Sequence, residues 1–380
     1  MKVLHITAWY PSSERPGWSP FVQRHVLALQ PFADQRVWHL SVTMARSWGL
    51  DRRAHLADRT LLLSGPFRSW RILEWASTLL VLLAWFTRDR SFRPDLVNFC
   101  IAYPNCVHTG ILKFFIRRPF VITEHYSAYH YGFNTASQGL ERIRRIFRQG
   151  TPVIAVSRAL VQDIERFART TLPSVCVVHN VVDGARFHHR AEPPPEEGRF
   201  FALAYWRPPK RPDLLIEALS ILVSRGFNAR LRIGGSGDQL DAVRVRSREL
   251  GVEDRIDLLG DLSPDRVAEE MNRAHLFLHA SDHETYAVVC AEALCCGTPV
   301  VASMVGGIPE YLDPERGRVV PDPSPETWAE TIEAIWESAW HADRYELASR
   351  SIAINSPDAV GARYASFLQD VLDKRTQRSQ

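Results

Sequence analysis

The sequence lacks the features that mark several other classes of protein. Its formal net charge is only +3 over 380 residues, which does not indicate a nucleic-acid binder. Its six cysteines include no pair at the spacing of zinc ligands; they lie at positions 100, 106, 176, 290, 295 and 296. We therefore expect the adjacent pair Cys295 and Cys296 to fill a core, and buried thiols suit a reducing cytoplasm.

Long hydrophobic runs are also missing. The longest, residues 72–87, is interrupted by Glu74 and is shorter than the roughly 20 residues that span a bilayer. Arginines flank it at positions 68, 71, 88, 90 and 93. Two interpretations stay open: a mostly buried helix of a first domain, or an anchor lying on a membrane surface with Trp70, Trp75 and Trp85 at the interface.

No leader segment is evident, and one charged cluster is ambiguous. Met1 and Lys2 run directly into an apolar strand, so we expect no signal peptide. Arginines gather at positions 142, 144, 145 and 148. This cluster is either a solvated helix face or a surface for an anionic membrane or acceptor.

The remaining composition is that of a globular protein with two domains. Hydrophobic residues make up 46% and charged residues 23% of the chain, and its length favours two cores. Strands are expected at 2–7, 36–43, 95–100, 120–123, 153–157, 175–178, 199–204, 255–260 and 275–279, with a further strand starting at 231. Helices are expected at 21–30, 158–167, 213–223, 265–273 and 356–374. This alternation predicts an α/β fold of two doubly wound, Rossmann-like domains.

Composition also suggests where the domains divide. Residues 191–198 contain three consecutive prolines and three glutamates, as a semi-rigid linker would. We therefore expect a first domain over 1–190 and a second over 199–355. A C-terminal helix is expected within 356–380.

One stretch, residues 281–303, is more specific than the rest. Glu284 precedes an expected helix and Glu292 lies within it, so the two carboxylates are roughly 12 Å apart if the segment is mostly helical. That separation is similar to the distance from the ribose to the hexose of a nucleotide-sugar, and carboxylates accept hydrogen bonds from hydroxyls. Gly297 is placed as a left-handed C-cap, and a buried strand starts at Val300.

Other candidates lie where expected strands end. The pair Gly306 and Gly307 is followed by Pro309, which predicts a turn into a helix whose free N–H groups bind phosphate. Arg207 and Lys210 follow a strand in a loop that fits a diphosphate, or is simply a basic loop. The glycine-rich turn with Gly235 and Gly237 is weak evidence for phosphate.

In the expected first domain, His125 follows a strand. A histidine at the carboxyl end of a strand either contacts substrate or has a structural role. His130 is a weaker second candidate. Gly17 lies in the loop after the first strand, and this loop either binds a ligand or is a plain connection.

The segment ETYAVVCAEALCCGTPVVASMVGGIPE, residues 284–310, resembles the corresponding stretch of glycosyltransferase family 4, retaining enzymes with the GT-B fold. The resemblance implies two domains facing a cleft, and a last helix within 356–380 that crosses back to the first domain. It places Glu284 on the donor sugar, Glu292 on the ribose and Lys210 on the diphosphate. Arg207 joins Lys210, although Tyr205 stands where many members carry the arginine. The remaining assignments implied by the family are His125 near the donor sugar, Gly17 at the acceptor, and Gly235, Gly237, Leu262, Tyr286, Ala287 and Val288 at the donor.

The function implied by this resemblance is transfer of a hexose from a nucleotide diphosphate sugar to an acceptor hydroxyl, with retention and without a metal or cofactor. The partners would be the donor and a glycan, glycolipid or small-molecule acceptor, and no nucleic acid. Cell-envelope polysaccharide, lipopolysaccharide or glycolipid assembly is the expected setting, in the cytoplasm, with peripheral contact at the inner face of the membrane left open. A nucleotide-sugar epimerase, a phosphorylase of the same fold and a non-catalytic carbohydrate-binding protein are the alternatives.

Overall fold

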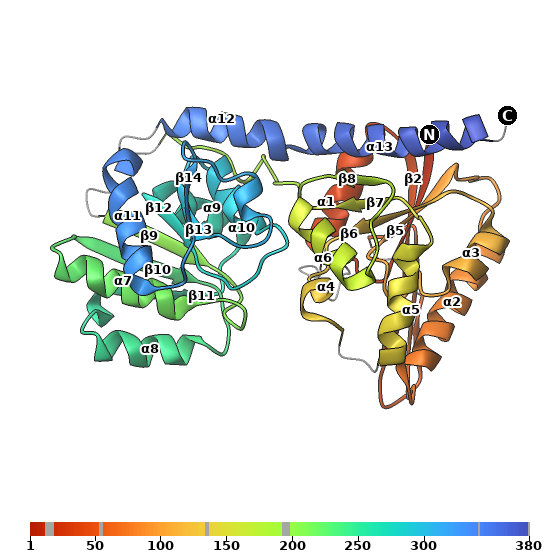
Figure 1. Ribbon diagram of the computed structural model, residues 1–380, viewed down its shortest axis with the longest axis horizontal. Coiled ribbons are helices and arrows are strands. Elements are labelled where there is room, and N and C mark those ends of the chain that lie inside the picture. Colours follow the sequence, from red (N-terminus) through yellow and green to blue (C-terminus); the bar gives the residue numbers. More distant parts are fainter. Residues whose placement is uncertain (12–18, 53–55, 134–136, 192–197, 341–342, 379–380) are drawn as a thin grey trace. The chain divides into compact units, whose positions relative to one another are not determined.

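The chain folds into two α/β units, each built around one sheet (Figure 1). This computed structural model describes residues 1–11, 19–52, 56–133, 137–191, 198–340 and 343–378. The first unit comprises Met1–Val181 and Pro357–Gln380, and the second comprises Val182–Ser356. The expected boundary at residue 190 therefore lies inside the second unit. Most of the expected linker, residues 192–197, lies outside the described residues.

The sheet of the first unit has the strand order β3-β4-β2-β1-β5-β6-β7-β8. Neighbouring strands are parallel, except that β3 runs antiparallel to β4. The strands are β1 (Lys2–Thr7), β2 (Asp34–Met44), β3 (Gly49–Asp51), β4 (Arg59–Gly65), β5 (Leu96–Cys100), β6 (Phe120–Glu124), β7 (Val153–Ala155) and β8 (Val175–Val177). The central strands β5, β6 and β7 are buried throughout, as parallel strands covered on both faces must be.

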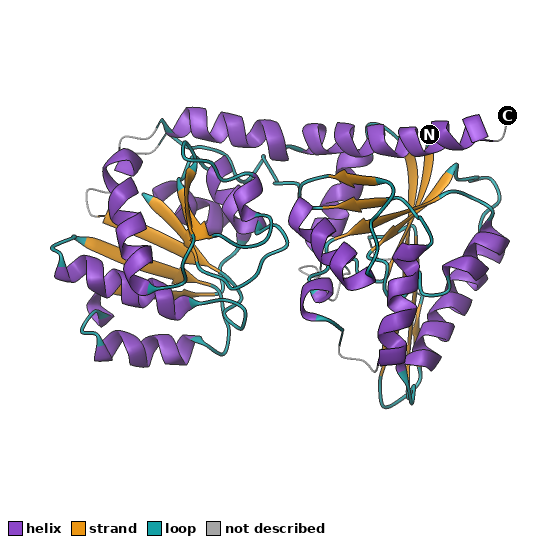
Figure 2. Ribbon diagram, in the orientation of Figure 1, coloured by secondary structure: helices purple, strands orange, loops and turns teal. Residues whose placement is uncertain are grey.

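Helices surround this sheet (Figure 2). They are α1 (Pro20–Leu29), α2 (Trp70–Phe86), α3 (Thr109–Ile116), α4 (Ala128–Tyr131), α5 (Ser137–Arg148), α6 (Arg158–Ala168) and α13 (Pro357–Arg378). Ser157 caps α6, because its side chain accepts a 3.0 Å hydrogen bond from the backbone N–H of Leu160.

The second unit has a parallel sheet in the order β11-β10-β9-β12-β13-β14. Its strands are β9 (Gly198–Leu203), β10 (Ala229–Gly234), β11 (Ile256–Gly260), β12 (Leu276–His279), β13 (Val300–Ser303) and β14 (Gly317–Val320). Its helices are α7 (Pro212–Ser224), α8 (Leu240–Glu249), α9 (Pro264–Arg273), α10 (Val288–Cys295), α11 (Pro325–Trp340) and α12 (Arg344–Asn355), with 3₁₀ turns η1 (Glu253–Arg255) and η2 (Ile308–Glu310).

The sequence predicted the end of α10 correctly, but not the helix expected after the Gly306–Gly307 turn. Gly297 has φ +77° directly after the helix, which confirms the left-handed C-cap. The helix expected to begin at Pro309 is wrong, because η2 ends after a single turn. Pro314 supplies no backbone N–H and restricts Asp313 to extended conformations, so a helix that begins at Pro309 has no room to continue.

The C-terminal helix α13 belongs to the core of the first unit. Tyr364 is fully buried, and its hydroxyl lies 2.6 Å from Asn98 Nδ2 and 2.7 Å from Thr123 Oγ1. A Cβ at Gly361 would lie 2.0 Å from the carbonyl oxygen of Ala28, so only glycine allows α13 to approach α1 this closely. The first unit is therefore completed by the last residues of the chain.

Helix α2 covers most of the 72–87 run and has one buried and one exposed side. One face is buried and includes Glu74, whose carboxylate pairs with Arg142 at 2.6 Å. Trp85 is buried and stacks with Arg88, so its expected place at a membrane interface is wrong. Trp70 and Trp75 are exposed. Within the described parts of the chain, no helix is long and apolar enough to cross a membrane.

Candidate functional site

The candidate site of the second unit lies at the carboxyl ends of β9 and β12. These strands are neighbours, although β10 and β11 lie between them in the sequence and extend the sheet to the other side. The chain therefore reverses its direction of sheet growth between β9 and β12. Ligands of open α/β sheets bind at such a switch point, outside the carboxyl ends of the strands.

The loops that follow β9 and β12 are joined along their backbones. Lys210 and Ser281 form an antiparallel bridge. The N–H of Asp282 donates to the carbonyl of Pro209 at 2.9 Å, and the N–H of Arg211 donates to Ala280 at 3.1 Å. The basic loop and the acidic loop thus form one surface, which sequence spacing alone could not show.

Glu284 is the centre of this surface. Lys210 Nζ donates to Glu284 Oε1 in an ion pair, and His279 Nε2 lies 2.7 Å from the same oxygen. Burial alone would raise the pKa of the Glu284 carboxyl, but Lys210 and His279 together lower it to about 2. The carboxylate is therefore ionised at neutral pH and ready to accept hydrogen bonds from hydroxyl groups.

His279, which ends β12, was missed in the sequence analysis. Burial and the charge of Lys210 lower its pKa, although Glu284 acts in the opposite direction. A neutral imidazole can bond to the carboxylate only through a protonated Nε2, so His279 donates to Glu284 and fixes its orientation. The signal available in the sequence was a histidine at the end of a buried strand, five residues before Glu284.

Gly306 holds the neighbouring loop against Glu284. It follows β13, the strand beside β12, and has φ +54°. A Cβ at this position would lie 1.5 Å from the backbone oxygen of Glu284. The glycine is therefore required both for its backbone conformation and for close approach to the acidic loop.

The glycine-rich turn after β10 packs on the basic loop in the same way. A Cβ on Gly235 would lie 2.0 Å from the carbonyl oxygen of Ala204, and one on Gly237 would lie 2.1 Å from that of Trp206. Trp206 is buried, and its indole N–H donates to the carbonyl of Gly234 at 2.8 Å. These glycines are thus needed to fix the basic loop. Leu262 follows β11 and is half-buried against this turn.

The cations of the basic loop have different partners. Arg211 is bound by Asp213 at 2.7 Å and by Asp282 at 3.3 Å. Arg207 is exposed, and its Cζ lies 4.9 Å from the centre of the Tyr205 ring. Lys210 and Arg207 are therefore the cations of this loop that an anionic ligand can engage without displacing Arg211 from its carboxylates.

Helix α10 presents the second glutamate. Glu292 lies on it and is only 7% exposed. The helix begins at Val288, so the segment from Glu284 to Glu292 is helical only in its second half. Ala287, at φ 62°, turns the chain into the helix. The side chain of Tyr286 is buried and its hydroxyl donates to Asn355, so only its backbone can face a ligand.

In the first unit, His125 follows β6 and belongs to a chain of histidines. Its Nε2 lies 3.3 Å from Nδ1 of His25, whose Nε2 lies 2.8 Å from the carbonyl oxygen of His179. Burial and the neighbouring His25 lower the pKa of His125 well below its ordinary value, while Asn180 acts in the opposite direction. Because a carbonyl only accepts, His25 donates to His179 and accepts from His125. His125 is thus neutral with Nδ1 left as an acceptor.

Two other predicted residues, Gly17 and His130, belong to the first unit. Gly17 lies outside the described residues. His130 is exposed on α4 and lies 3.2 Å from Asp163 of the same unit.

Close to His125, a cavity of about 370 Å³ is lined by aromatic side chains, including Trp70, Tyr103, Tyr126 and Phe133.

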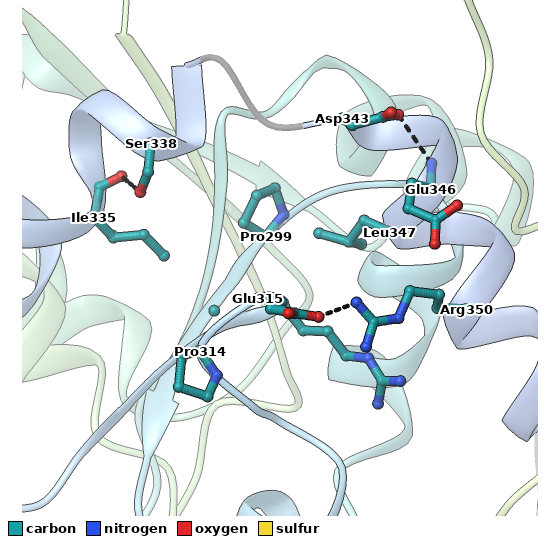
Figure 3. Close-up of a pocket in the computed structure, with 11 residues that line it drawn as sticks. Pro299, Pro314, Glu315, Ile335, Ser338, Asp343, Glu346, Leu347 and Arg350 are labelled. Carbon is teal, nitrogen blue, oxygen red and sulfur yellow. Dashed lines mark hydrogen bonds and ion pairs between the residues drawn. The ribbon is translucent and has the colours of Figure 1, made fainter.

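A different pocket of the second unit lies away from the candidate site (Figure 3). Its volume is about 330 Å³, and its lining includes Pro299 and Gly317, which stand at the amino ends of β13 and β14. Arg350 pairs with Glu315, and Asp343 accepts the N–H of Glu346 at 3.0 Å. These polar groups satisfy one another at the opposite edge of the sheet from Glu284.

The two α/β units, each with a mostly or wholly parallel sheet, have the architecture of a GT-B glycosyltransferase. Family models match both parts: residues 22–186 match Glycosyltransferase Family 4, and residues 185–351 match Glycosyl transferases group 1. The chain belongs to the family 4-type glycosyltransferases, as the segment around Glu284 predicted.

Curated relatives match locally. The chain is 36% identical over 130 residues to D-inositol 3-phosphate glycosyltransferase of Mycobacteroides abscessus, a match that covers 33% of this chain and 29% of that protein. It is 32% identical over 124 residues to the gpi3 subunit of phosphatidylinositol N-acetylglucosaminyltransferase of Schizosaccharomyces pombe, covering 32% and 27%. The chain thus spans less than a third of the length of these relatives.

Solved structures match over the whole chain. HepE of Anabaena, in complex with UDP, superimposes with a TM-score of 0.73 at 17% identity and covers 97% of this chain and 100% of its own. Sucrose-phosphate synthase of Thermosynechococcus elongatus gives a TM-score of 0.73 at 17% identity, covering 98% and 100%. These similarities establish the predicted GT-B fold.

Proposed function

We propose that this chain transfers a hexose from a nucleotide diphosphate sugar to an acceptor hydroxyl, with retention of the anomeric configuration. The observation that carries the proposal is the cluster of Lys210, Glu284 and His279 at the switch point of the second unit. Membership of the glycosyltransferase family supports the reaction class, and the HepE complex supports a nucleotide-containing donor.

Each residue of this cluster has a role in the proposed reaction. Glu284 accepts hydrogen bonds from the sugar, in an orientation that His279 fixes. Lys210 exchanges part of its interaction with Glu284 for the diphosphate, and Arg207 adds a second cation. The leaving nucleoside diphosphate gains negative charge in the transition state, and preorganised cations stabilise such charge strongly. Glu292 is proposed to bind the ribose.

The same groups are proposed to make a metal unnecessary. Backbone N–H groups near Gly306 and Gly307 add to the positive field around the diphosphate. His125 is proposed to contact the donor sugar as a neutral imidazole, as its lowered pKa requires. It would then act through hydrogen bonding rather than through charge.

The acceptor is proposed to be a glycan or glycolipid of the cell envelope. The aromatic cavity beside Tyr126 supports this proposal, because flat aromatic surfaces pack well against sugar rings. Free cysteines at all six positions are consistent with a reducing cytoplasm. We further propose that the enzyme works there, in peripheral contact with the inner face of the membrane.

A donor screen tests the proposed function. Thermal unfolding is measured with a panel of nucleotide-sugars, because a ligand at 100 times its Kd stabilises the native state by about 2.7 kcal/mol. For each stabilising donor, release of nucleoside diphosphate is then measured with and without candidate acceptors, and the product anomer is determined by NMR. The proposal predicts acceptor-dependent release and a retained anomer.

Other outcomes identify the alternatives. An epimerase converts the donor without an acceptor and releases no nucleoside diphosphate. A phosphorylase needs inorganic phosphate and an unactivated glycan. A chain that binds glycans but consumes no donor is a non-catalytic binding protein, and this result would refute the transferase.

A further inference from the structure

Helix α2 exposes an apolar face along its whole length. Ile72, Trp75, Leu79, Leu83 and Phe86 recur every three or four residues, which places them on one side of a helix. Their exposed fractions are 51, 41, 61, 53 and 56%. The opposite side packs into the first unit, so this face is not needed for the core of the unit.

The apolar surface continues onto α3. The ring of Phe86 lies 5.8 Å from that of Phe115, which lies 5.1 Å from Phe114. Phe114 is 64% exposed. We call this surface the α2/α3 face; it consists of Ile72, Trp75, Leu79, Leu83, Phe86, Phe114 and Phe115. Contiguous exposed apolar surface of this kind marks a site of interaction.

Arginines border the α2/α3 face at both ends. Arg68 and Arg71 are exposed at the start of α2, and exposed arginines at positions 90, 93, 117 and 118 follow α2 and α3. Between residues 68 and 118 the sequence has eight lysines and arginines but three acidic residues. One of these acids, Glu74, is buried and paired with Arg142.

The arginines after α2 and α3 gather because of the topology. The chain leaves α2 to enter β5 and leaves α3 to enter β6. Since β5 and β6 are parallel neighbours, the residues just before them lie at the same edge of the sheet, that of the amino ends. After the effect of burial, the charges of Arg90, Arg118 and Arg93 lower the pKa of Arg88, as closely spaced cations do. This edge is the opposite one from His125, which follows the carboxyl end of β6.

A basic pocket lies at the same edge. It has a volume of about 740 Å³, and its lining includes Lys113, Arg118, Lys374 and Arg375. Of the described residues that line it, none carries a carboxylate. Lys113 donates to Thr151 at 3.1 Å, which leaves donors of the same ammonium group for an anion.

We propose that the α2/α3 face docks on an anionic phospholipid bilayer. The exposed aromatic and aliphatic side chains enter the headgroup region, while the bordering arginines and the basic pocket contact lipid phosphates. An apolar face with cations around it binds such a surface, because apolar burial and electrostatic attraction add together. This inference deepens the peripheral membrane contact proposed above and rests on it, but it does not depend on the transfer reaction.

The docking surface also suggests where the acceptor comes from. Trp70, the first residue of α2, is exposed and lines the aromatic cavity assigned to the acceptor. The docked helix therefore connects the bilayer to that cavity. An acceptor carried by a lipid in the same bilayer fits this arrangement.

Vesicle binding tests the proposal with the full chain and no donor. Cosedimentation is measured with vesicles of phosphatidylcholine alone and with vesicles that also contain phosphatidylglycerol. We expect binding only to the anionic vesicles. The variant Leu79→Gln/Leu83→Gln should bind at least about tenfold more weakly, since each leucine loses apolar burial. Arg90→Gln/Arg93→Gln should lose about 25-fold, from ~1 kcal/mol for each cation near the surface.

The matched control is Val245→Gln/Arg244→Gln on α8, where Val245 is 54% exposed, and it should bind like the unaltered chain. Equal binding to neutral vesicles, no binding at all, or unchanged binding of the α2 and arginine variants would overturn the proposal. Dimerisation that the leucine changes abolish, without vesicle binding, would assign the face to a second copy instead. Failure of the transferase is separate, because donor consumption in solution does not involve the α2/α3 face.

Discussion

At the scale of single residues, the proposed transfer depends on the ionised state of Glu284. Lys210 and His279 were placed beside it by the adjacency of β9 and β12. The sequence predicted Lys210 and Glu284 as site residues, because the family pattern marks both. It did not predict their pairing or the part of His279, because strand order, not sequence spacing, brings these groups together.

The depressed pKa of Glu284 predicts how stability depends on pH. A carboxyl group whose pKa falls from 4.5 to about 2 on folding stabilises the native state above pH 4.5, and this contribution is lost as the pH falls toward 2. Its full size is about 3 kcal/mol. Urea unfolding of Glu284→Gln between pH 5 and 2 should therefore show a shallower pH dependence than the unaltered chain. The exposed Glu253→Gln is the control, and an unchanged slope in Glu284→Gln would contradict the assigned pairing.

The pairing of Lys210 with Glu284 predicts a non-additive effect. Lys210→Met leaves a largely buried carboxylate with only His279, and we expect a loss of about 2 kcal/mol of stability. Adding Glu284→Gln should restore most of that stability but none of the transfer, which should be lower by a factor of about 10² to 10³. Chemical denaturation and donor turnover measure the two effects. Additive stability losses, or full turnover in Lys210→Met, would remove the ion pair from the site.

At the scale of elements, the site is held by loops that approach through glycines. The sequence predicted the Gly306–Gly307 turn as a phosphate-binding helix start, but η2 is a single 3₁₀ turn. The function of Gly306 that the structure reveals is contact with the backbone of Glu284. That contact depends on β13 lying beside β12 and on the positive φ of Gly306, and no spacing rule gives either.

Gly306→Ala should therefore displace the acidic loop. The added Cβ would lie 1.5 Å from the backbone oxygen of Glu284, so the loop must shift. We expect donor binding weaker by at least about tenfold, or ~1.4 kcal/mol, by calorimetry. Gly184→Ala is a matched control in the second unit, because its Cβ would meet nothing within 4 Å. Donor affinity that survives Gly306→Ala would contradict the proposed position of the site.

Helix α10 allows a test of the second glutamate. If Glu292 accepts hydrogen bonds from the ribose, Glu292→Ala should weaken binding of a free nucleoside diphosphate by about 1.5–3 kcal/mol, as expected for hydrogen bonds to a charged group. Calorimetry measures this difference, and a 2′-deoxyribose analogue should lose less in the variant than in the unaltered chain. Equal losses for both chains would leave Glu292 without a part in ribose binding.

At the scale of the whole molecule, alternating strands and helices were sufficient to predict two doubly wound units. The boundary was less predictable, because the proline-rich segment after residue 190 is the strongest compositional cue but the second unit begins at Val182. The family resemblance implied that the last helix crosses back to the first domain, and α13 belongs to the first unit. The contacts that hold it there, through Tyr364 and Gly361, depend on tertiary packing. A local pattern cannot show such contacts with residues hundreds of positions away.

Removing α13 should consequently affect the first unit most. A chain ending at Ser356 loses Tyr364 with its hydrogen bonds and exposes the core around Val3 and Leu29. Limited proteolysis with mass spectrometry should show rapid cleavage within residues 1–181 and protection within 182–356. A chain ending at Asp373 retains Tyr364 and should resist cleavage. Equal resistance of both truncated chains would contradict the structural role of α13.

The most direct test of the central claim is hydrogen exchange with the nucleoside diphosphate that stabilises the chain most. If the donor binds at the proposed site, exchange should be slower in the loops after β9, β10, β12 and β13, around residues 204–210, 234–239, 282–290 and 304–307. Protection confined to other segments, such as the pocket around Arg350, or no protection in these loops at a saturating concentration, would contradict the donor site.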